Sequence, residues 1–133
     1  MSEPKIFACD PAPGCRYAAV LGRTTFEASM RNGQKLIDRL AGGKYSALVI
    51  DYRAAEPSLT PEQYTDFFRF ILPEVSKLDS VAYIYSPGTL MRAAHATRQL
   101  TSMGVKARAF SNWNEAAVFI GIEADDPFLQ AAP

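Results

Sequence analysis

The chain has 133 residues, of which 48% are hydrophobic and 21% are charged, a composition that suits one globular domain with one core. Its 14 lysines and arginines balance its 14 aspartates and glutamates, and this zero net charge argues against nucleic-acid binding through bulk charge. No apolar stretch approaches the roughly 20 residues of a membrane span, and the first residues lack a signal-peptide pattern, so we expect a cytoplasmic protein. Because the chain has one histidine and two cysteines, we expect no metal site and no cofactor.

The predicted fold begins with a hairpin and a helix. Residues 5–9 and 17–22 indicate two strands around a turn rich in proline and glycine. Thr24 predicts the N-cap of a helix that spans Thr25 to Ala41. Gly33 lies inside that helix, where glycine costs about 1 kcal/mol relative to alanine, and we expect it to mark a close approach to the sheet.

A buried strand and a second helix follow. Residues 47–52 are a continuous apolar run, which predicts a central strand covered on both faces. Residues 60–63 combine an N-cap threonine, a proline at the first helical position and a capping-box glutamine, and they predict a helix start. Pro73 removes a backbone donor, so we expect a kink or a restart of this helix near Leu72.

The second half of the chain repeats the alternation of strand and helix. Residues 80–85 indicate a strand, and residues 86–89 predict the start of a third helix. Its inward-facing residues are predicted to be Leu90, Ala93, Ala94, Thr97 and Leu100. Residues 106–110 alternate like an edge strand, and Asn112 predicts the cap of a final helix.

This order of elements predicts an α/β fold. Helices that alternate with strands favour a mostly parallel sheet, and the hairpin adds an antiparallel edge strand. We expect a single domain over residues 1–122 and a C-terminal tail over residues 123–133.

Residues 105–120 combine a phenylalanine, a polar cap, a Glu-Ala pair and an aromatic–aliphatic pair. This pattern and the element order resemble the SpoIIAA-like proteins of the STAS superfamily, over roughly residues 17–122. The resemblance implies a mixed five-stranded sheet flanked by about four helices. It also implies a non-enzymatic role, since relatives serve as anti-sigma-factor antagonists or regulatory modules, and others are cytoplasmic proteins related to the CRAL-TRIO lipid-binding fold.

One motif of that family is missing. Anti-sigma-factor antagonists carry a phosphorylatable serine in an Asp-Ser-Ser/Ala-Gly type motif directly after the central strand. In this chain the junction is residues 51–55, which read Asp-Tyr-Arg-Ala-Ala. Ser58 lies further along, and we do not expect it to be a regulatory phosphosite. The phosphorylation switch is therefore not carried over.

Neither the histidine nor the cysteines indicate a catalytic role. Helical spacing groups His95 with Met91 and Arg98, which indicates a solvated helix face rather than a catalytic base. Cys9 and Cys15 flank the hairpin turn and could pair if oxidised, but they are expected to be buried, small hydrophobic residues. We expect no catalytic residues.

The carboxyl ends of the parallel strands are the first candidate for a binding site, because ligands of open α/β sheets bind there. Two arginines beside helix N-termini predict a weak site for a phosphate or carboxylate. The candidate residues are Arg23, Asp51, Tyr52, Arg53, Ser86, Gly88, Thr89 and Ser111. The alternative is that they are ordinary helix caps and exposed charges.

The second helix is the other candidate, because it has four aromatic residues in seven positions. They are Tyr64, Phe67, Phe68 and Phe70. One stripe of a helix cannot bury them all, so we expect an exposed ring at a homodimer interface, at a partner surface or at the mouth of a lipid pocket. A broad buried face is the alternative.

Two functions remain open. The first is a non-enzymatic regulatory or protein-interaction domain of the SpoIIAA-like type, with a homodimer or an unidentified protein as partner. The alternative is a small-ligand carrier that binds an anionic or lipid-like molecule at the C-terminal edge of the sheet; an enzyme is the weakest hypothesis. A deep apolar cavity under residues 64–72 would favour the carrier, and a flat exposed aromatic patch would favour the interaction domain.

Overall fold

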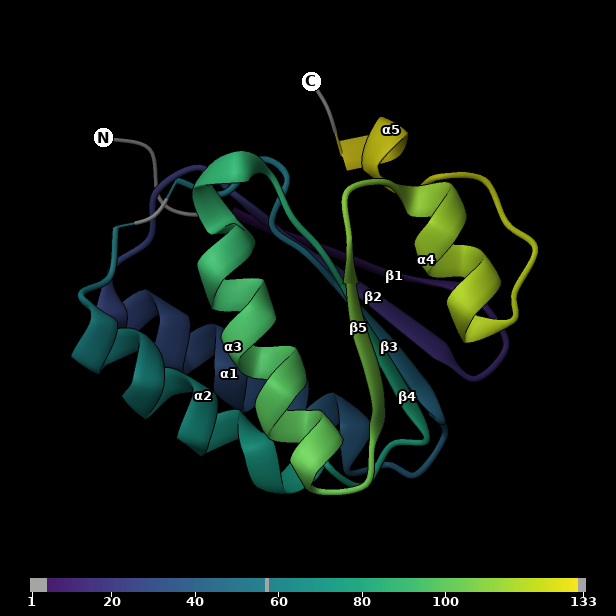
Figure 1. The fold of residues 1–133 in the computed structure, drawn as a ribbon, viewed down its shortest axis with the longest axis horizontal. Coiled ribbons are helices and arrows are strands. Elements are labelled where there is room, and N and C mark those ends of the chain that lie inside the picture. Colours follow the sequence, from purple (N-terminus) through teal and green to yellow (C-terminus); the bar gives the residue numbers. More distant parts are fainter. Residues whose placement is uncertain (1–4, 57, 132–133) are drawn as a thin grey trace.

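A five-stranded mixed sheet organises the computed structural model, which describes residues 5–56 and 58–131 (Figure 1). The strands are β1 (Lys5–Ala12), β2 (Cys15–Leu21), β3 (Ala47–Asp51), β4 (Ser80–Ile84) and β5 (Lys106–Phe110). They lie side by side in chain order. β1 pairs antiparallel with β2, and every other neighbouring pair is parallel. The predicted sheet, with its antiparallel edge strand, is confirmed.

Helices cover both faces of the sheet. They are α1 (Phe26–Leu40), α2 (Pro61–Val75), α3 (Leu90–Ser102), α4 (Trp113–Ile120) and the short α5 (Phe128–Ala131), with a 3-10 turn η1 (Pro87–Thr89) before α3. Figure 1 shows α1, α2 and α3 on one side of the sheet and α4 on the other. None of the helices that the structure describes is long and apolar enough to cross a membrane.

The side chains of β3 alternate between two cores. Leu48 and Ile50 pack with α2 and α3, whereas Val49 packs with Trp113 and Ala116 of α4. Every residue of β3 is buried, which confirms the central strand that the apolar run predicts.

Hydrogen bonds at the helix starts explain where α1 and α2 begin. The Thr25 hydroxyl accepts from the Ala28 backbone N–H at 3.1 Å, so the N-cap of α1 is Thr25, and the prediction of Thr24 was wrong by one residue. At α2 the predicted capping box is confirmed, with Thr60 and Gln63 bonded to each other's backbone N–H at 3.1 and 3.0 Å.

Gly33 marks a close approach between two helices, and the predicted approach to the sheet was wrong. A Cβ at Gly33 would lie 3.1 Å from Ile71 Cγ2 and 3.1 Å from Phe67 Cε1, both on α2. α1 therefore makes its main contact with α2 rather than with the strands.

Two other helix details differ from the prediction. α2 continues through Pro73 to Val75, so the helix does not restart near Leu72; Pro73 lies in its last turn. In α3, Leu90 lies in the first turn and is 42% exposed, and Ala94 is half-buried, whereas Ala96 shares the buried face with the remaining predicted residues.

Candidate functional site

The strand-end candidates separate onto the two faces of the sheet. Asp51, at the end of β3, lies on the α4 side, fully buried. Its carboxylate accepts from the Tyr17 hydroxyl at 2.5 Å, from the Arg53 backbone N–H at 2.9 Å and from the Arg53 guanidinium at 2.7 Å. Tyr52, the next residue, belongs to the core on the opposite face.

Arg53 is held between two carboxylates. Its guanidinium donates to both oxygens of Asp126 at 2.9 and 2.8 Å as well as to Asp51, and it lies 4.4 Å from the centre of the Phe128 ring. Burial opposes the charge, but the hydrogen bonds to Asp126 and Asp51 outweigh it and raise the pKa of Arg53. The arginine predicted to bind an external anion is thus bound by the chain's own acids.

The remaining strand-end candidates differ in their exposure and in their partners. The Arg23 side chain is 77% exposed and has Glu56 3.9 Å away. Gly88 and Ser111 are exposed. The others are half-buried or buried: the Thr89 hydroxyl accepts from the Ser86 backbone N–H at 3.0 Å, which is the hydrogen bond of a helix cap.

The aromatic residues of α2 face inward. Tyr64 and Phe68 are buried, and Phe67 and Phe70 are partly buried against the same core. His95 of α3 packs edge-on against Tyr64 and Phe68, with ring centres 6.5 and 6.0 Å apart, so its predicted position on a solvated face was wrong. α1 on one flank and α3 on the other create the broad buried face that was the alternative.

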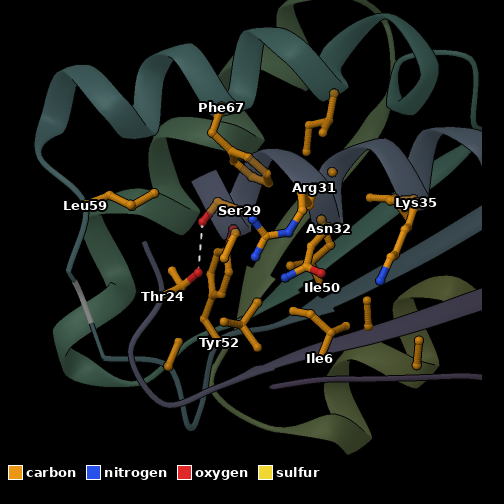
Figure 2. Close-up of a pocket in the computed structure, with 18 of the residues that line it drawn as sticks. Ile6, Thr24, Ser29, Arg31, Asn32, Lys35, Ile50, Tyr52, Leu59 and Phe67 are labelled. Atoms are coloured by element: carbon orange, nitrogen blue, oxygen red, sulfur yellow. Dashed lines mark hydrogen bonds between the residues drawn. The ribbon is translucent and has the colours of Figure 1, made fainter. Parts of the chain in front are cut away.

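A cavity of about 450 Å³ lies between α1 and the sheet (Figure 2). Its floor is apolar and comes from the first three strands, through Ile6, Ala8, Ala18, Val20 and Ile50. Its inner end is formed by α2 and the preceding loop, through Leu59, Tyr64, Phe67 and Ile71. The cavity exists because α1 packs mainly against α2, so that the face of the first two strands opposite α4 is left open.

The α1 wall of the cavity is cationic. Arg31, Lys35 and Arg39 are spaced four residues apart on one face of the helix, and all three line the cavity. Figure 2 shows Arg31 and Lys35 extending from α1 toward the strands, above Ile6 and Ile50. Arg39 donates to the Tyr45 hydroxyl at 3.1 Å, whereas Arg31 and Lys35 form neither a hydrogen bond nor a salt bridge with any described residue.

Hydroxyl groups and the guanidinium of Arg92 mark the end of the cavity near the carboxyl ends of the strands. The hydroxyls of Thr24 and Ser29 lie 3.2 Å apart, and Tyr52 and Thr89 line the same end. Arg92 is held there by the Leu59 carbonyl at 2.6 Å, above the Tyr64 ring. Burial raises the pKa of Tyr52 to about 12, so its hydroxyl stays protonated at neutral pH.

Some of these residues were predicted from the sequence and others were not. Tyr52, Thr89, Tyr64 and Phe67 were candidates, but for two separate sites. The cationic wall was missed, although the four-residue spacing of its basic residues is visible in the sequence. The close approach at Gly33 was expected against the sheet, whereas Gly33 packs against Ile71 and Phe67 of α2.

The two cysteines are free thiols in the structure. Cys15 is buried, and burial raises its pKa to about 11; burial also raises the pKa of Cys9. Such thiols are mostly protonated at neutral pH and therefore poor nucleophiles and metal ligands. Across residues 5–56 and 58–131, no group of three or more His, Cys, Asp or Glu side chains could hold a metal ion.

Comparison with known proteins identifies the fold. No protein-family model and no curated protein matches the sequence. An uncharacterized protein from Shewanella loihica with a SpoIIAA-like fold superposes with a TM-score of 0.64 at 17% identity, over 90% of this chain and 96% of that one. An anti-sigma factor antagonist from Mycobacterium paratuberculosis superposes with a TM-score of 0.60 at 17% identity, over 90% and 96%. The anti-sigma factor antagonist SpoIIAA in its unphosphorylated form gives 0.57 at 10% identity, over 86% and 94%.

The chain has the SpoIIAA-like fold. The resemblance inferred from residues 105–120 is thereby confirmed for the fold. In this SpoIIAA-like domain the residue after β3 is the buried Tyr52. The Ser58 hydroxyl is part-buried and engaged with the backbone of Thr24, accepting from its N–H at 3.1 Å and donating to its carbonyl at 2.7 Å.

Proposed function

We propose that this chain is a non-enzymatic, cytoplasmic binding domain of the SpoIIAA-like type, whose regulatory state depends on a small, largely apolar ligand between α1 and the sheet. The cavity of about 450 Å³ is the observation on which the proposal rests. Small-molecule sites typically have about 300–1,000 Å³ and an apolar lining with few polar groups. The carrier alternative expected an apolar cavity under residues 64–72, whereas this cavity lies between α1 and the sheet and only its inner end is formed by Tyr64, Phe67 and Ile71.

The packing of α1 supports a ligand-dependent state. Gly33 anchors α1 to α2, while Ala18 and Val20 of β2 lie under the open cavity. A ligand there would remove apolar surface of both walls from water and would stabilise the folded state by mass action. It would also fix the position of α1 relative to the sheet, so the structure would differ between the ligand-bound and the ligand-free protein.

The chemistry of the lining supports binding rather than catalysis. Among its described residues, Glu56 is the single carboxylate, its side chain is 65% exposed, and none is a histidine or cysteine. General acid–base catalysis works best with a group whose pKa lies near the operating pH, whereas burial moves the pKa of Tyr52 away from neutrality, to about 12.

A regulatory domain that binds a partner protein is the second candidate, and the fold supports it. Two of the similar structures are anti-sigma factor antagonists. In this chain, regulation through a partner protein would not use a phosphorylatable serine after β3. Residues 51–55 contain no serine, and the Ser58 hydroxyl donates to the Thr24 carbonyl. Occupancy of the cavity and binding of a partner are compatible, because a ligand that moves α1 can change the surface seen by a partner.

Native mass spectrometry of protein purified from its source tests the proposal. We expect a retained small molecule that is released on denaturation. The variant Ala18→Leu, which fills the floor of the cavity, should lose the molecule, whereas Ala41→Leu, at an exposed position beyond α1, should keep it. A ligand-free protein that is not stabilised by any apolar probe, including dodecan-1-ol, would contradict the proposal.

A further inference from the structure

Resting on this binding function, we infer that the ligand is a single-chain anionic amphiphile. Its carboxylate or phosphate headgroup lies between Arg31 and Lys35, and its chain lies on the apolar floor with its end toward Phe67 and Ile71.

The two walls of the cavity differ in chemistry, which is the first argument. The strand wall is aliphatic apart from Arg16, whose guanidinium donates to Asp10 at 2.9 Å, and the α1 wall presents three cations. A helix that covers a sheet ordinarily places apolar residues on the covering face. A neutral apolar ligand would make no ionic contact with the cations, and a small hydrophilic anion would bury no aliphatic surface. An anionic amphiphile can contact both walls.

The unpaired state of two cations is the second argument. Arg31 and Lys35 have no acidic partner in the described part of the chain, and unlike unpaired cations such as Lys44 and Arg98 they line the cavity. Like charges four residues apart on a helix repel each other. An acid headgroup between them would relieve that repulsion and accept charge-assisted hydrogen bonds.

The orientation of the chain follows from exposure. Arg31 and Lys35 are exposed, whereas Ile71 is fully buried at the inner end beside Phe67. The headgroup therefore stays at the wet mouth and the chain points toward α2. The volume of about 450 Å³ lies in the lower half of the range for small-molecule sites, which favours one chain over two.

Four probes of equal chain length test the inference by calorimetric titration below their micelle concentrations: dodecanoate, dodecyl phosphate, dodecan-1-ol and dodecyltrimethylammonium. We expect the anionic probes to bind about tenfold or more tightly than the alcohol, and the cationic probe to bind most weakly. Comparison of dodecanoate with dodecyl phosphate assigns the headgroup class. The preference for anions should decrease as salt is added.

Paired variants locate the headgroup. Arg31→Gln with Lys35→Gln should reduce dodecanoate affinity to that of the alcohol while leaving alcohol binding unchanged. The matched control, Lys44→Gln with Arg98→Gln, removes two exposed cations elsewhere and should change neither. Equal binding of all four probes, or unchanged dodecanoate affinity in the first double variant, would overturn the inference and leave the proposed function standing. Failure of every probe to bind would overturn both.

Discussion

Gly33 sets the distance between α1 and α2 by having no side chain. A Cβ there would lie 3.1 Å from side-chain atoms of Ile71 and Phe67, closer than comfortable packing allows. Alanine gains about 1 kcal/mol of helix propensity at such a position. The neighbouring side chains must shift to admit the methyl group, which offsets that gain.

Substitutions at Gly33 should therefore become worse with size. We expect Gly33→Ala to be nearly neutral and Gly33→Leu to cost about 1–3 kcal/mol of unfolding free energy, because overpacking forces the two helices apart. Urea denaturation monitored by circular dichroism measures both. Gln34→Leu, on the exposed side of the same helix, is the control and should change stability little. A stabilising Gly33→Leu would contradict the close packing of α1 on α2.

The carboxylate of Asp51 is buried, and the hydrogen bonds that it accepts from Tyr17 and Arg53 offset the cost of burying its charge. Asp51→Ala leaves the buried Tyr17 hydroxyl without its acceptor and Arg53 with one carboxylate instead of two. Removing one member of a buried ion pair costs about 3–5 kcal/mol, and we expect a loss in that range. Thermal unfolding compared with Asp66→Ala, at an exposed position on α2, measures it. An equal effect of the two substitutions would show that Asp51 carries no structural charge.

At the scale of elements, the segment after α4 is fastened at two points. The Trp113 indole N–H donates to the Ala124 carbonyl at 2.9 Å, and Asp126 binds Arg53 next to Phe128 of α5. The sequence analysis described residues 123–133 as a tail, and that domain boundary stays a prediction. Local patterns could not reveal these contacts, because Arg53 and Asp126 lie 73 positions apart.

Asp126 should make the docking of this segment sensitive to acid. Burial alone would raise its pKa, but hydrogen bonds from Arg53 and from the Phe128 backbone N–H lower it below the usual 3.8. A lowered folded-state pKa stabilises the fold above pH 3.8, and this contribution disappears as the pH falls through the folded-state value. Asp126→Asn should therefore destabilise the protein by about 1–2 kcal/mol near neutral pH.

The pH dependence distinguishes the loss of the Asp126–Arg53 ion pair from a general destabilisation of the fold. The stability difference between Asp126→Asn and the parent chain should shrink toward zero as the pH falls through the folded-state pKa of Asp126, which lies below 3.8, because the protonated carboxyl is then neutral like the amide. Its exposed neighbour provides the control: Asp125→Asn should change the free energy of unfolding little. Denaturant titrations from acid to neutral pH measure both variants, and a constant difference across that range would rule out the ion pair as its cause.

For the whole molecule, the sequence predicted the layers well and the site only in part. The alternation of strands and helices and the buried β3 follow from local sequence patterns. The cavity does not follow from periodicity. It depends on whether the apolar face of α1 packs against the sheet or against α2. The packing against α2 is a tertiary contact made at Gly33.

The predicted homodimer is also a property of the whole molecule, and it stays a prediction. The predicted interface depends on an exposed ring on α2, but Phe68 is 2% exposed, and Phe67 and Phe70 are partly buried. Sedimentation at high concentration is the test, with Phe70→Ser as the variant, because that position lies further from the core than Phe68. A dimer that this variant dissociates without loss of helical circular dichroism would support the interface, whereas a monomer in both cases would remove it.

The order of the strands has a consequence for how the chain is made. Because neighbours in the sheet are also neighbours in the sequence, each strand that leaves the ribosome meets an edge that is already available for pairing. No strand has to be inserted between two that have already joined. Residues 126–128 follow all five strands in the chain, so the second carboxylate on Arg53 is added only after the complete sheet has been synthesised.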